Sequence, residues 1–160
     1  MKRWPDHSGN LMVEVLISIA VLMLFSLGLS NLAIANGRAV DQSAAVTRAV
    51  NYARQTMEQV VAVKHQDWHD LADMAPAANY RVTNISGSWQ LQAAPAEDLG
   101  EGYQRRIAID EGRRRSGQLD QAGSDPDPLT RFVTVTVEWV EDGVNKNYVL
   151  HTYLTNWKGQ

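Results

Sequence analysis

The chain opens with a long apolar stretch and then adopts an amphipathic pattern. From Val15 to Ala35 it carries no formally charged residue, and a helix of that length spans about 31 Å, the thickness of a bilayer core. After Gly37, apolar residues recur at steps of three and four, which places one stripe along a helix face. The stripe consists of Val46, Val50, Ala53, Met57 and Val60.

One long helix is predicted from these two patterns. No proline occurs between Pro5 and Pro76, so the helix can run from about Leu11 to Lys64. We expect residues 10–36 to form its transmembrane half and residues 37–64 its amphipathic half. A coiled-coil partner would also bury the stripe, but docking against the chain's own sheet is the commoner outcome.

The remainder, residues 65–160, is predicted to be a β-rich domain. A connecting loop with one helical turn is expected from Lys64 to Ala78. Period-two patterns and turn residues follow it, and Asp142-Gly143 marks the turn of a hairpin. A helix followed by hairpins predicts an α+β domain with an antiparallel sheet laid on the helix. The predicted strands cover residues 80–85, 88–93, 103–109, 132–140 and 147–155.

In two of these strands the alternation also predicts which side chains share a face. The first has Tyr103, Arg105, Ile107 and Ile109 on one face. The second has Val133, Val135, Val137 and Trp139 on one face, with Thr134, Thr136 and Glu138 on the other.

Charge and cysteine content narrow the classes of partner. The 15 basic and 18 acidic residues give a net charge of -3, which argues against broad attraction to nucleic acid. The chain has no cysteine, which excludes disulfides and thiolate metal sites. Lys2 and Arg3 precede the apolar stretch, and the positive-inside rule therefore places this end in the cytoplasm and the C-terminal domain in the periplasm.

Glu14 is the unusual residue of the apolar stretch. An acid within a membrane span costs about 3 kcal/mol at the bilayer centre and usually has a partner. If the chain were cut after Gly9, the new amine of Asn10 would lie about one helical turn from Glu14 and would suit an ion pair. The alternative is a glutamate that lies in the lipid headgroup region.

A conventional secretory signal is a second interpretation of the N-terminal region. Ala33-Ile34-Ala35 is a pattern that a signal peptidase reads. Signal h-regions are usually about 7 to 15 residues long and lack an acid, whereas this one is longer and contains Glu14. The helical pattern also continues beyond Ala35, which favours a retained anchor.

The run from Gly9 to Leu16 resembles the type IV prepilin signature, in which a glycine precedes the cut and a glutamate is the fifth mature residue. The resemblance covers about the first 60 residues and implies a basic leader, residues 1–9, that is removed by a membrane-bound prepilin peptidase. It also implies methylation of Asn10 and pairing of Glu14 with the N-terminal amine of a neighbouring subunit. Many family members have phenylalanine or methionine where this chain has Asn10, so the resemblance extends to cleavage more fully than to methylation.

Within that family the chain looks most like PilV-type minor pilins, through Glu14-Val15-Leu16 and the later Arg48-Ala49 and Met57-Glu58 pairs. The resemblance implies a pilin-like fold, single-pass insertion in the inner membrane, and assembly into a type IV pilus through helix packing with other pilin subunits. The I-type pseudopilins of type II secretion rank second. The implied protein is structural, with no enzymatic activity and no cofactor.

Three clusters outside the anchor carry weaker chemical hypotheses. His65 and His69, with Asp67 and Asp70, would suit one metal ion if a helical turn presented both imidazoles, although solvated loop residues are the default. A Gly/Pro/Asp-rich loop offers oxygen ligands for calcium, but the spacing is not that of an EF-hand. Its acids are Asp120, Asp125 and Asp127.

The third cluster is basic. Arg113, Arg114 and Arg115 lie between Gly112 and Gly117 and would contact DNA phosphates if exposed at a filament tip. No aromatic residue stands among them, so a solvated loop is favoured over a DNA site.

Overall fold

The computed structural model describes residues 8–76 and 78–157, with side chains from Leu11 onward. Its residues group into two compact units, Met1–Ala44 and Ala45–Gln160. Helix α1, Ser8–Gln66, begins in the first unit and ends in the second. The predicted long helix is therefore confirmed, to within three residues at either end.

The first unit is an apolar helix with unburied side chains. The large apolar side chains between residues 11 and 34 are 46–76% exposed. Among the described residues, α1 is the one helix long and apolar enough to cross a membrane. These side chains need an apolar environment that the chain itself does not provide.

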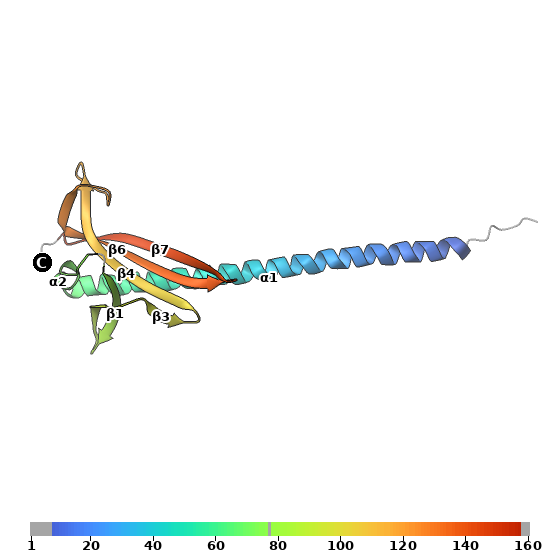
Figure 1. Cartoon of the computed structure of the whole chain (residues 1–160), viewed down its shortest axis with the longest axis horizontal. Coiled ribbons are helices and arrows are strands. Elements are labelled where there is room, and N and C mark those ends of the chain that lie inside the picture. Colours follow the sequence, from blue (N-terminus) through green and yellow to red (C-terminus); the bar gives the residue numbers. More distant parts are fainter. Residues whose placement is uncertain (1–7, 77, 158–160) are drawn as a thin grey trace, which may run out of the picture. The chain divides into compact units, whose positions relative to one another are not determined.

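The second unit is an α+β domain in which residues 45–66 of α1 pack on an antiparallel sheet (Figure 1). The described strands follow the order β2-β1-β4-β6-β7, and β3 and β5 also pair with β4. The elements after α1 are α2 His69–Ala72, β1 Asn79–Ile85, β2 Ser88–Ala93, β3 Glu97–Gly100, β4 Tyr103–Arg115, β5 Gln118–Leu119, β6 Asp125–Glu141 and β7 Val144–Thr155.

The core of the domain contains side chains of α1 and the inward-facing side chains of the strands. The inward side chains of β4 and β6, such as Ile107 and Val135, are fully buried, as the period-two pattern predicts. Asp142 and Gly143, with φ of 50° and 75°, join β6 to β7 in a two-residue turn that confirms the predicted hairpin. Arg105 shares the buried face of β4 with the apolar residues, also as predicted.

The buried face of α1 is displaced from the predicted stripe. Ala53 and Val60 are fully buried, but Val46 is 44% exposed because it lies only one residue inside the second unit. Two alanines bring the helix close to the sheet, since a small side chain allows close approach. The fully buried residues are Ala49, Ala53, Thr56, Val60 and Val63.

The region predicted as a Gly/Pro/Asp-rich loop also differs from the prediction, because most of it forms strands. Arg113–Arg115 end strand β4, while Asp125 and Asp127 begin β6. The chain turns at Gly117, whose φ is +81°, and only residues 116–117 and 120–124 of this region lie outside strands. The turn residues suggested a loop because the pairing of β4 with β6 across them is not visible in the sequence.

Candidate functional sites

The predicted cleavage junction lies at the start of α1. Gly9 and Asn10 belong to this helix, and the side chain of Asn10 falls outside the described part. Glu14 follows Asn10 by four residues, about one turn, and its side chain is exposed. While Gly9 is joined to Asn10, the nitrogen of Asn10 is an amide rather than a charged amine. An ion pair between Glu14 and this nitrogen therefore requires cleavage.

Serines of the apolar segment bond to their own helix. Ser18 Oγ donates to the Glu14 carbonyl oxygen at 2.8 Å, and Ser26 and Ser30 donate in the same way to Leu22 and Ser26 at 2.9 Å. These bonds satisfy hydroxyls that would otherwise be costly in lipid. Burial of this segment in a bilayer therefore needs no partner helix for its serines.

The arginine cluster and the aspartates proposed for calcium form one network. Arg114 Nε donates to Asp127 Oδ2 at 2.8 Å, and Arg114 Nη1 donates to the Gly117 carbonyl oxygen. Arg115 pairs with Asp120 at 3.3 Å. Two of the three arginines and two of the three aspartates thus neutralise one another, and the sequence, in which they stand apart, gave no sign of this pairing.

Asp127 is the most enclosed carboxylate of this network. Its exposed fraction is 9%, and it accepts hydrogen bonds from Thr130 Oγ1, Arg114 Nε and the Leu129 backbone amide. Burial alone would raise the pKa of Asp127, but these donors outweigh it and hold the pKa below its ordinary value. Asp127 is an anchoring residue of β6, with its oxygens already engaged.

The two histidines are separated by the end of a helix. His65 belongs to the last turn of α1 and His69 begins α2, so no single helical turn presents both, contrary to the sequence hypothesis. Asp67 Oδ1 accepts a hydrogen bond from the His69 backbone amide at 2.8 Å and acts as a turn residue. Within residues 8–76 and 78–157, no three His, Cys, Asp or Glu residues gather in a metal-binding arrangement.

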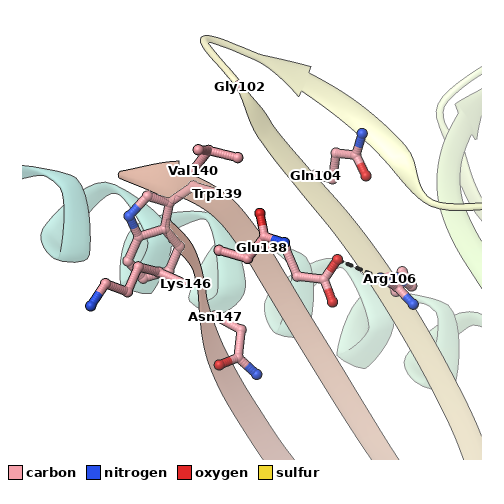
Figure 2. A pocket seen from close by; sticks show the side chains of 9 residues that line it. Gly102, Gln104, Arg106, Glu138, Trp139, Val140, Lys146 and Asn147 are labelled. Carbon is pink, nitrogen blue, oxygen red and sulfur yellow. Dashed lines mark hydrogen bonds and ion pairs between the residues drawn. The ribbon is translucent and has the colours of Figure 1, made fainter. Parts of the chain in front are cut away.

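A polar pocket of about 510 Å³ is open on the sheet near the β6–β7 turn. Figure 2 shows Arg106 of β4 paired with Glu138 of β6, with Gln104 and Asn147 nearby. Sequence analysis missed this pocket, because only the register of β4 against β6 brings Arg106 and Glu138 together. The charges of Arg106 and Glu138 neutralise each other across the two strands.

Comparison with known proteins adds no family. No family model, characterised protein or solved structure matches this chain. The function of this chain is therefore inferred from its residues and their geometry. The apolar helix and its single acid, Glu14, are the features that the chain's own contacts leave unexplained.

Proposed function

We propose that the chain is a structural minor pilin. Prepilin peptidase cuts it after Gly9, and the mature chain enters a type IV pilus, or the complex that primes one, through the first half of α1. Its partners are the helices of other pilin subunits and, before assembly, the lipids of the inner membrane.

The observation that carries this proposal is the two-part character of α1. Residues 45–66 supply the buried face of an α+β domain, whereas the apolar side chains between residues 11 and 34 stay 46–76% exposed. A helix of this kind suits a subunit that is first anchored in lipid and later packs against equivalent helices. A cleaved secretory signal would not need to continue as the core helix of the mature domain.

Glu14 supplies the negative charge in the proposed contact between subunits. A carboxylate near the start of an apolar helix is stabilised by the positive end of the helix dipole and by a nearby amine. Cleavage would create such an amine on Asn10. In a filament, the amine of one subunit and Glu14 of a neighbour neutralise each other away from water.

The same anchor and domain would serve a pseudopilin of type II secretion, and one fractionation experiment separates the two systems. Surface filaments are sheared from cells that express the epitope-tagged chain together with both filament systems. A minor pilin is expected in the sheared fraction, at lower abundance than the main subunit. Absence from that fraction, together with loss of protein secretion in the deletion strain, would contradict the pilus assignment and favour the pseudopilin.

We do not extend the proposal to DNA binding. Arg114 and Arg115 are paired with Asp127 and Asp120, so most of the charge that would meet phosphates is already neutralised. Replacement of Arg113, Arg114 and Arg115 by alanine is therefore expected to leave gel-shift behaviour unchanged. Salt-sensitive DNA binding that this triple variant loses would reverse this judgement.

A further inference from the structure

A short strap crosses the part of α1 that enters the domain. The strap, residues 97–105, comprises β3, a two-residue turn and the start of β4, and lies beside α1 in Figure 1. Its side chains contact α1 between Ala45 and Thr56. The sequence predicted a strand from residue 103, but neither β3 nor these contacts with α1 were predicted.

The inner contact is a buried guanidinium. Arg105, 8% exposed, donates from Nη1 to Thr56 Oγ1 at 2.7 Å and from Nε to Glu97 Oε2 at 3.1 Å. Arg105 Nη2 forms an ion pair with the same Glu97 oxygen. A buried cation of this kind depends on its carboxylate, because an unpaired charge is costly away from water.

Two further contacts hold the first docked turns of α1. The Tyr103 hydroxyl donates to the Ala45 carbonyl oxygen at 3.2 Å, and Glu101 pairs with Arg48. Burial, the largest influence, raises the pKa of Tyr103, with Arg48 opposing it, so the phenol keeps the proton that it donates.

Apolar burial is uneven along the docked part of α1. Its first half buries Ala49 and Ala53, whereas its second half buries Val60 and Val63. Alanine removes little apolar area from water, and valine removes considerably more. Docking of the first half therefore depends on the polar contacts of the strap and on the edge-on contact of the Tyr52 ring with the Tyr103 ring, whose centroids are 5.6 Å apart.

A buried polar group next to the strap has no hydrogen-bond partner among the described residues. The Trp139 ring stacks on Tyr103 with centroids 6.0 Å apart, and its buried indole N–H has no acceptor among the described residues. Such a group loses its hydration without compensation. The indole N–H of Trp139 therefore contributes no hydrogen bond that would hold the strap closed.

We infer that the strap is a conformational latch: residues 97–105 and residues 45–56 of α1 open together as one local unit, while the second half of the docked helix stays in place. Local opening of this kind uses regions with few apolar contacts and many polar ones. The latch decides whether the free part of α1 ends near Ala45 or near Thr56. This inference does not depend on assembly into a pilus.

Amide hydrogen exchange of the full chain in detergent micelles tests the latch. Glu97→Gln removes the charge that compensates Arg105, and exchange at residues 49–56 and 97–105 is expected to accelerate together by about tenfold or more. Exchange at residues 60–63 and 133–137 should change by less than about twofold. The matched control is Glu138→Gln, which removes an exposed ion pair of the same sheet and should leave residues 49–56 unchanged.

A milder variant covers the case in which Glu97→Gln fails to fold. Tyr103→Phe keeps the ring and removes the hydrogen bond to Ala45, so exchange at residues 49–53 is expected to accelerate by about threefold. Unchanged exchange at these residues in the variants that fold would overturn the inference. Equal acceleration throughout the core would do so as well, because it would indicate global unfolding rather than a latch.

Discussion

Asp127 is a carboxylate whose surroundings set its ionisation at the start of β6. Its pKa lies below the ordinary value because the donors Thr130, Arg114 and Leu129 outweigh the effect of burial. A group with a lowered folded-state pKa stabilises the fold above its unfolded pKa of about 3.9. That stabilisation is lost as the pH falls through the lower, folded-state pKa.

Asp127→Asn is expected to lower the free energy of unfolding at pH 7 by about 2 kcal/mol, because the charged acceptor of Arg114 and Thr130 is lost. The difference from wild type should shrink as the pH falls through the lowered folded-state pKa of Asp127, because the wild-type carboxylate itself becomes protonated there. Denaturant unfolding across a series of pH values from 7 downward measures this difference. The control Asp120→Asn removes an exposed pair and should cost less than about 1 kcal/mol; equal effects of the two variants would contradict the role given to Asp127.

Gly112 lies where β4 shifts its register against β6. A Cβ atom there would stand 2.6 Å from Thr130 Cβ and 2.9 Å from the Thr130 carbonyl oxygen. Gly112→Ala should therefore destabilise the domain by about 1–3 kcal/mol, as overpacking does. Thermal unfolding measures this, with Gly37→Ala as the control, since a Cβ at Gly37 meets nothing within 4 Å. A Gly112→Ala variant as stable as wild type would show that β4 and β6 are further apart here.

At the scale of elements, sequence periodicity predicted the stretches in which one face is buried in the core throughout. Strand β6 alternates cleanly from Val133 to Trp139 because every second side chain of this stretch is buried in the domain core, so this stretch could be assigned from the sequence. Helix α1 was predicted in extent, but its buried face was displaced because Ala49 and Thr56 carry little hydrophobic signal. Strand β3 was missed because its four residues include two acids and a glycine. Strand β3 is stabilised by its pairing with β4 and by the contact of Glu97 with Arg105. Neither interaction is visible in the local sequence.

Candidate sites, too, could be recognised from the sequence only where their signal is local. Glu14 was found because an acid in an apolar run is conspicuous within the sequence itself. The pairs Arg114–Asp127 and Arg106–Glu138 were missed because their members are joined only by the pairing of β4 with β6.

The proposed role of α1 in assembly can be tested at Glu14. Glu14→Ala is expected to insert in the membrane as well as wild type, or better, because it removes an acid from an apolar helix. Its recovery in sheared filaments should fall by about tenfold, since one ion pair per subunit is lost. Immunoblots of the membrane and filament fractions measure both quantities.

Glu14→Gln is the matched control for this experiment, because it keeps the size and polarity of the side chain and loses only the charge. A defect like that of Glu14→Ala supports the ion pair. Normal recovery of both variants in filaments would remove the role assigned to Glu14.

On the scale of the whole molecule, the chain contains two different units. The first presents an exposed apolar helix, and the second is an α+β domain with its own core from Ala49 to Leu154. A subunit that is anchored first and assembled later needs both. The proposed orientation, with the leader in the cytoplasm and the domain in the periplasm, rests on Lys2 and Arg3. It predicts that protease added to spheroplasts digests the domain, and a domain that stays intact would contradict it.

The N-terminal sequence of the mature protein is the decisive measurement for cleavage after Gly9. The protein is extracted from the membranes of cells that contain a prepilin peptidase, and its first residues are read by Edman degradation or by mass spectrometry of the N-terminal peptide. The account predicts a chain that begins at Asn10 and still contains the whole apolar segment. A chain that begins at Asn36, or one that keeps Met1 in the presence of the peptidase, would contradict it.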